Sequence, residues 1–343
     1  MKVLTVLTIA FLITACAGPA VGSPPGSQGR PSTATTVTTS STPTPSSAPT
    51  PGPTATMSPT IGQAADDGAR IVNVTSVDAR TRDLVIDSPA VGVVGVRILV
   101  PRQFDAQPTT RWPVLYLLHG ATGQHLNWTQ SSDVEAFTQA TNLLVVMPDG
   151  GEKGWYSDWW NGGRGGAPMW ETFHLDELAQ LLERNWHAGK RRVIAGLSMG
   201  GYGAMEYAAR RPGMFLAAAS YSGAVDPIGG ELDIGTKDLW GDPVAQADVW
   251  KAHDPVNLAA ALKGTALYIS YGDGMPGPLD QAGASADDLE TWIAGLNKTF
   301  VARLRELKIP ATVEAYGPGT HDWPYWQRAL HRSMPLLLKA LGG

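Results

Sequence analysis

A serine inside a glycine-rich segment is the residue of this sequence best placed to do chemistry. Residues Gly196 to Gly200 read Gly-Leu-Ser-Met-Gly, the Gly-x-Ser-x-Gly pattern that surrounds a nucleophilic serine. An apolar run over 193–195 predicts a buried strand before it, and good helix formers over 202–210 predict a helix after it. We therefore interpret Ser198 as a nucleophile, rather than as an incidental residue of a glycine-rich turn.

A serine nucleophile needs a base and an acid that orients this base. When the serine lies in such a turn, the acid and then the histidine follow it along the chain. His321 is predicted as the base, because it lies in a glycine-rich loop after the last predicted strand, whereas His331 falls inside a helix. For the acid, spacing alone favours Asp273, which directly follows a predicted strand, but further carboxylates, including Glu290, come later.

The reaction also needs two backbone N–H groups that hold the negative oxygen of the intermediate. One would come from Met199, directly after the nucleophile, and the other from the loop after the strand that ends at Leu118. Ala121 is the predicted second donor, since Gly120 and Gly123 beside it allow a ligand oxygen to approach closely.

The elements that would position these residues alternate between strands and helices. This alternation predicts one α/β domain with a mostly parallel central sheet and helices on both faces. The predicted strands are 71–77 at an edge, 84–86, 93–100, 113–118, 143–147, 193–195, 215–220, 266–271 and 311–315, and the predicted helices are 133–140, 171–186, 202–210, 287–307 and 324–341.

Tryptophan is unusually frequent, with 12 Trp against 6 Phe. Trp155 and Trp159 fall in a loop after a strand, and Trp323 falls beside the predicted base. We expect these three side chains to form a wall for an acyl chain or a stacking face for a sugar. Packing under a long loop is the alternative for each of them.

The N-terminal region is predicted to export and anchor the protein. Residues 1–16 combine a charged start, a short apolar run and small residues, as in a secretory signal. The lone cysteine, Cys16, follows Ile-Thr-Ala, which resembles a lipobox and predicts a lipid anchor in a membrane. The alternative is an ordinary signal peptide cut near Ala15 or Ala17, which would leave the protein secreted. Residues 17–66 are rich in Thr, Ser and Pro and predict a disordered tether, so that 67–343 would form the catalytic domain.

Composition argues against several other classes of protein. The formal net charge is −5 and no basic stripe is present, so nucleic acid is not an expected partner. No cluster of Cys and His and no phosphate-binding loop is found in the sequence, so neither a metal nor an organic cofactor is expected.

Several segments, in order, resemble the esterase D-like family and within it the mycolyltransferases of the antigen 85 type. This similarity implies an α/β-hydrolase fold and acyl-ester chemistry, and it places the acid of the triad at Glu290 rather than at Asp273. Besides the serine motif, the similar segments are Tyr156-Ser157-Asp158-Trp159, Trp170-Glu171-Thr172-Phe173, Asp238-Leu239-Trp240-Gly241, Asp254-Pro255 and 319–326.

The sequence departs from the antigen 85 type where that family binds its sugar acceptor. His119 and Thr122 replace an Asp and an Arg of the family, and the loop between Asp226 and Asp238 is shorter. We therefore expect hydrolysis of acyl esters, or acyl transfer, through an acyl-enzyme on Ser198. Two alternatives are the transfer of long acyl chains to a sugar or glycerol, and a cell-surface binding module without catalysis.

Overall fold

The structure is a computed structural model that describes residues 61–161, 168–230 and 239–342. All described residues belong to one compact unit. The predicted signal (1–16) and most of the predicted tether (17–66) lie outside the described residues. Residues 61–66 do belong to the folded part, because the N–H of Ile61 donates to the carbonyl oxygen of Ile71 at 2.8 Å. The N–H of Gln63 likewise donates to Oδ1 of Asn185 at 2.7 Å.

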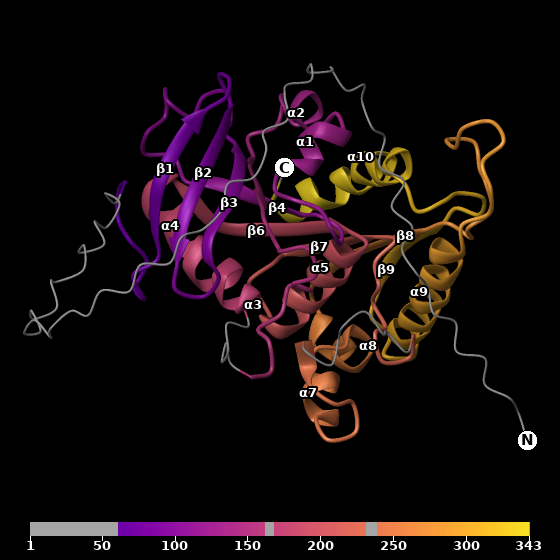
Figure 1. The fold of residues 1–343 in the computed structure, drawn as a ribbon. Helices are drawn as coiled ribbons and strands as arrows, with labels where there is room; N and C mark the ends of the chain where they lie inside the picture. Colours follow the sequence, from indigo (N-terminus) through magenta and orange to yellow (C-terminus); the bar gives the residue numbers. More distant parts are fainter. Residues whose placement is uncertain (1–60, 162–167, 231–238, 343) are drawn as a thin grey trace, which may run out of the picture. The chain divides into compact units, whose positions relative to one another are not determined.

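A nine-stranded sheet forms the centre of the described part, in the order β1-β2-β3-β5-β4-β6-β7-β8-β9 (Figure 1). Neighbours from β1 to β5 in this order pair antiparallel, and the rest pair parallel. The mostly parallel sheet expected from the sequence is confirmed, with β1 at an edge. The strands are β1 (Arg70–Ser76), β2 (Thr81–Ser88), β3 (Gly92–Leu99), β4 (Trp112–Leu118), β5 (Leu144–Pro148), β6 (Ala188–Leu197), β7 (Ala217–Tyr221), β8 (Ala266–Tyr271) and β9 (Ala311–Ala315).

Two separate hydrophobic cores cover the two faces of this sheet. Successive side chains of a strand point to opposite faces, so that Ile194 of β6 joins one core and its neighbours Val193 and Ala195 join the other. The continuous apolar runs of β4, β5 and β7 are buried for this reason.

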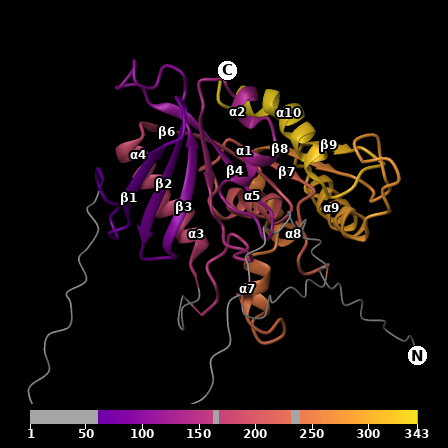
Figure 2. The ribbon, with the colours of Figure 1, turned by 45° about the horizontal axis from the view of Figure 1, so that its top comes forward.

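Helices lie on both faces, as Figure 1 shows. One face is covered by α10 with α1 and α2, and the other by α4, α5 and α9, and the turned view of Figure 2 agrees. The helices are α1 (Asn127–Ser131), α2 (Val134–Phe137), α3 (Trp170–Thr172), the π-helical turn η2 (Phe173–Glu177), α4 (Leu178–Asn185), α5 (Met199–Arg210), α7 (Ala247–Ala252), α8 (Pro255–Leu258), the 3₁₀ turn η3 (Ala259–Leu262), α9 (Asp288–Glu306) and α10 (Trp323–Ala340).

The helices differ from the sequence prediction mainly where they are short. The predicted helix over 133–140 is only α2, whereas the preceding α1 and the later α7 and α8 were not predicted. Helices of four to six residues bury too few side chains to leave a periodic pattern. None of the helices in the described ranges has the length and apolarity that a membrane span requires.

Candidate active site

Ser198 lies in a sharp turn between β6 and α5, with φ 53° and ψ −121°. Residues other than glycine rarely adopt such a backbone, and two glycines make this turn possible. A Cβ on Gly196 would collide with the carbonyl oxygen of Gly200, and a Cβ on Gly200 would lie 2.5 Å from that of Leu118. The glycines of the motif therefore allow α5 to begin in close contact with the ends of β4 and β6. Ser198 itself remains partly exposed.

Ser198, His321 and Glu290 form a continuous hydrogen-bonded chain. Nε2 of His321 lies 2.9 Å from Oγ of Ser198, and Nδ1 of His321 lies 2.6 Å from Oε2 of Glu290. Because an ionised carboxylate only accepts hydrogen bonds, Nδ1 carries the ring proton when His321 is neutral. The lone pair of Nε2 then faces the Ser198 hydroxyl, which is the arrangement a general base requires.

Glu290 belongs to the first turn of α9 and is fully buried. Its Oε1 accepts hydrogen bonds from the N–H of Gly272 at 2.7 Å and from Oγ of Ser222 at 2.8 Å. Asp287 caps α9 through Oδ1, while its Oδ2 accepts the N–H of His321 at 2.8 Å. One carboxylate therefore fixes the loop of the base to the helix of the acid. Sequence analysis assigned no role to Ser222 or Asp287, although the preference of Asp for the N-cap of a helix could have identified Asp287.

Asp273, the acid that spacing alone favoured, does not reach His321. Its exposed carboxylate accepts the N–H of Met275 at 2.9 Å, and its own N–H donates to the carbonyl oxygen of Gly317. Asp273 thus stabilises its own turn, and the structure brings Glu290 to the histidine instead.

The loop after β4 passes directly beside the nucleophile. A Cβ on Gly120 would lie 3.3 Å from Cβ of Ser198. Among the described residues, neither the N–H of Ala121 nor that of Met199, the first residue of α5, donates to another group. Buried His119 holds this loop, since its Nδ1 bonds the carbonyl oxygen of Gly120 and its Nε2 accepts the N–H of Gly150 at 2.8 Å.

Several residues with strained backbone lie in the loops that follow the central strands. The described part has seven non-glycine residues with positive φ, and five of them follow strands β4 to β7. Such conformations persist only where the surrounding structure enforces them, and they are concentrated at functional sites. The five are Thr122, Trp155, Tyr156, Ser198 and Ser222.

The three predicted substrate-binding tryptophans differ in their exposure. Trp155 is 3% exposed and packs edge-on against Tyr202, so it is a core side chain and not the predicted wall. Trp159 and Trp323 are half-buried and keep surface that a ligand could contact. Trp323 is itself held edge-on by Trp128, with ring centres 5.3 Å apart.

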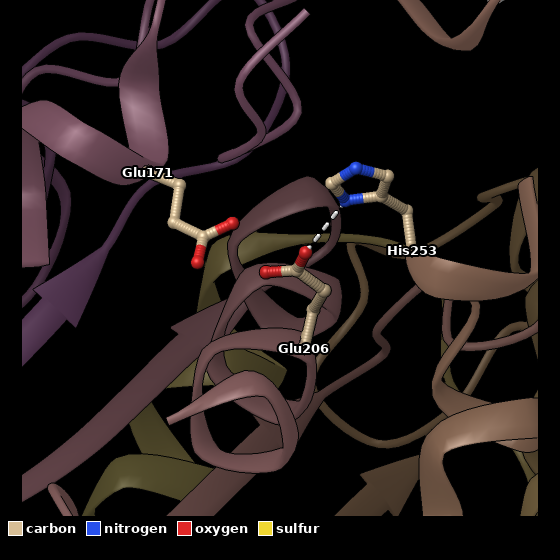
Figure 3. Close-up of side chains that lie close together, drawn as sticks. All are labelled: Glu171, Glu206 and His253. Atoms are coloured by element: carbon tan, nitrogen blue, oxygen red, sulfur yellow. Dashed lines mark hydrogen bonds and ion pairs between the residues drawn. The ribbon is translucent and has the colours of Figure 1, made fainter. Parts of the chain in front are cut away.

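Glu171, Glu206 and His253 form a buried cluster in which one potential metal-ligating atom of each lies within 4.8 Å of the others (Figure 3). A cation already lies between its carboxylates, because Nε of Arg210 is 2.7 Å from Glu171 and 3.2 Å from Glu206. Burial and the charge of Arg210 lower the pKa of His253 to about 3, so that the imidazole is neutral. Because Arg210 already occupies the position between the two carboxylates, and the neutral His253 bonds Glu206, this cluster does not fit a metal.

Comparison with known proteins agrees with this architecture. Residues 92–337 match the family described as "Putative esterase". Esterase Rv1288 of Mycobacterium tuberculosis is 30% identical over 262 residues, which are 70% of this chain but only 54% of that protein. The chain thus spans about half the length of this relative. The diacylglycerol acyltransferase/mycolyltransferase Ag85B of Mycobacterium leprae is 31% identical over 251 residues, covering 67% of this chain and 76% of that protein.

Solved structures show the same fold. Mycobacterium tuberculosis MPT51 superposes with a TM-score of 0.62 at 24% identity, covering 77% of this chain and 99% of that chain. An S-formylglutathione hydrolase from Agrobacterium tumefaciens gives a TM-score of 0.63 at 19% identity, with coverage of 79% and 99%. With the family match and these relatives, the sheet and its serine turn show that the chain belongs to this esterase family of α/β hydrolases, and that it is homologous to the antigen 85 mycolyltransferases.

Proposed function

We propose that the protein is a serine-dependent acyl-ester hydrolase that works through an acyl-enzyme on Ser198. The hydrogen-bonded chain from Ser198 through His321 to Glu290 is the observation that carries this proposal. Membership of an esterase family supports the same class of reaction.

The reaction would follow from the positions of these atoms. Oγ of Ser198 attacks the ester carbonyl carbon while its proton moves to Nε2 of His321. The imidazolium then gives this proton to the departing alcohol oxygen as the tetrahedral intermediate collapses to the acyl-enzyme. In the second half His321 takes a proton from water as the water oxygen attacks the acyl carbon. The bond from the acyl carbon to Oγ then breaks while the imidazolium returns the proton to Oγ, which releases the carboxylic acid and regenerates Ser198.

Two backbone donors would stabilise the intermediate. The N–H groups of Ala121 and Met199 flank the nucleophile and have no other partner in the described ranges. A donor of this kind lowers the barrier by roughly 3–4 kcal/mol. His119 would act indirectly, since it fixes the backbone of the loop that carries Ala121.

Transfer of the acyl group to an alcohol is the second candidate, because relatives 31% identical are named mycolyltransferases. Transfer competes with water only if the site binds and orients an acceptor. His119 is buried with both ring nitrogens engaged, and Thr122 is an exposed neutral residue. Neither side chain therefore provides the sugar with a hydrogen bond to a charged group. Such hydrogen bonds contribute about 1.5–3 kcal/mol each. We therefore place hydrolysis first.

With a medium-chain acyl ester as donor, we expect free acid as the main product and only slow transfer to trehalose or glycerol. Chromatographic separation of free acid from acyl-alcohol, with and without millimolar acceptor, measures this ratio. Acyl-trehalose as the main product would reverse the order of the two candidates.

The alternative hypothesis of a binding module without catalysis can be tested by covalent labelling of the wild-type protein. A serine-directed fluorophosphonate should label Ser198, and Ser198→Ala should abolish both labelling and product formation. Absence of labelling in the folded wild-type protein would support the module.

We further propose that the protein is exported and anchored by a lipid on Cys16. The motivation is the lone cysteine after Ile-Thr-Ala in a signal-like segment. The protein should fractionate with membranes, and Cys16→Ser should release it or block its processing. A wild-type protein found entirely in the soluble extracellular fraction would contradict the anchor.

A further inference from the structure

Ser222 combines a strained backbone with a buried hydroxyl. It follows β7 directly, is 1% exposed and has a φ of 45°, a conformation that favours glycine. Its N–H donates to the carbonyl oxygen of Ser270 at 2.7 Å, so the backbone of β8 fixes this conformation. The sequence thus carries a hydroxyl at a position where glycine would cost less.

The hydroxyl is directed at the acid of the site. Oγ of Ser222 donates to Oε1 of Glu290 at 2.8 Å, while Oε2 of the same carboxylate holds His321. Glu290 is fully buried, and a buried carboxylate stays ionised only if donors replace its lost hydration. Gly272 supplies one donor to Oε1 and Ser222 supplies the other.

Tyr316 lies beside this pair. Burial raises the pKa of Tyr316, and the negative charge of Glu290 raises it further, so the phenol remains neutral. It therefore adds no second negative charge next to the carboxylate.

We propose that Ser222 is a positioning residue of the candidate active site, whose hydroxyl fixes the Glu290 carboxylate in the rotation that presents Oε2 to His321. This inference rests on the proposed function. Two donors hold Oε1 from two directions, whereas without Ser222 the Gly272 N–H is the one remaining donor among the described residues that opposes rotation of Oε2 away from His321. A turned carboxylate would release Nδ1 of His321, and the imidazole would lose the orientation that points Nε2 at Ser198.

Ser222→Gly is the decisive variant, because it removes the hydroxyl and also relieves the strained φ. We expect the variant to remain folded, because relief of the strained φ offsets part of the loss of the hydrogen bond to Glu290. We expect kcat to fall roughly 10- to 100-fold, as for loss of a hydrogen bond to a charged group, with KM nearly unchanged. Ser222→Ala should lower kcat equally. Ser333→Ala is the matched control, since it removes a buried hydroxyl that bonds Tyr221 at 2.6 Å, and kcat should not change.

A double-mutant cycle tests whether Ser222 acts through Glu290. In a Glu290→Gln background, Ser222→Gly should lower kcat by less than twofold. A full additive loss in this background, or a Ser222→Gly enzyme with wild-type kcat, would overturn the inference. The rate of fluorophosphonate labelling distinguishes the two hypotheses. A wild-type protein that is not labelled would contradict the proposed function. Equal labelling rates of wild type and Ser222→Gly would contradict only the inference about Ser222.

Discussion

Replacing Glu290 by Gln is expected to lower kcat about 10⁴-fold while the protein stays folded. The reason is the direction of the hydrogen bonds on Oε1. The N–H of Gly272 and the hydroxyl of Ser222 both donate to this atom, so the amide oxygen of Gln must take its place. The amide NH₂ then faces Nδ1 of His321, which has to accept. The ring proton moves to Nε2, and His321 can no longer take the proton of Ser198.

The measurement is kcat for a soluble acyl ester, with thermal unfolding to show that the variant is folded. Asp273→Asn is the matched control, because this exposed carboxylate stabilises only its own turn, and kcat should stay within about twofold of wild type. A larger loss with Asp273→Asn than with Glu290→Gln would show that Asp273 supplies the acid when substrate is bound.

The serine and the histidine of the hydrogen-bonded chain can be found from the sequence because their signals are local. The Gly-x-Ser-x-Gly turn needs its glycines within the turn itself, and His321 is the histidine that follows the last strand in a loop. The acid has no such local signal. The N-terminus of α9 folds back onto the end of β8, so that Glu290 reaches the N–H of Gly272. Glu290 therefore holds the position next to His321 that spacing alone predicts for Asp273. The resemblance to a family, and not a local pattern, indicated Glu290.

The tryptophans show a second limit of sequence analysis. Trp155 and Trp159 are close in sequence and chemically identical, yet one is buried against Tyr202 and the other is half-buried. Trp155 has a φ of 51°, and this turn of the backbone directs its side chain into the core. No periodic pattern predicts a positive φ at a tryptophan. Ser222 was missed for the same reason, since its role depends on a strained backbone and a partner distant in sequence.

Replacing Arg210 by Leu is expected to destabilise the domain by about 3–5 kcal/mol at pH 7, as for a broken buried ion pair. The guanidinium bridges the carboxylates of Glu171 and Glu206, which are 4% and 0% exposed. In the described part no other cation lies within 4 Å of Glu206, since the neighbouring His253 is neutral. For a domain of this size, such a loss lowers Tm by roughly 10 °C. Arg303→Leu is the control, because the ion pair of Arg303 within the described ranges is with exposed Glu306 on α9.

The pH dependence separates lost charge pairing from lost packing of the Arg210 stem. Burial raises the pKa of Glu206 well above its usual value, and the charge of Glu171 raises it further, whereas Arg210 lowers it. Removing Arg210 raises this pKa more. In the variant, Glu206 binds its proton more tightly in the folded state than in the unfolded state. Its contribution to the free energy of unfolding is therefore fully present below the unfolded pKa of this carboxyl and is lost as pH rises. The Tm deficit of Arg210→Leu should therefore grow from pH 5 to pH 8.

Adding Glu206→Gln to Arg210→Leu should remove most of this pH dependence and restore part of the stability, since no unpaired charge remains on Glu206. Differential scanning fluorimetry of the wild type, both single variants and the double variant across pH 5–8 measures the effect. A deficit that is constant with pH and unchanged by Glu206→Gln would mean that Arg210 contributes only its packed stem. In that case the guanidinium does not act as the counter-charge of the Glu206 carboxylate.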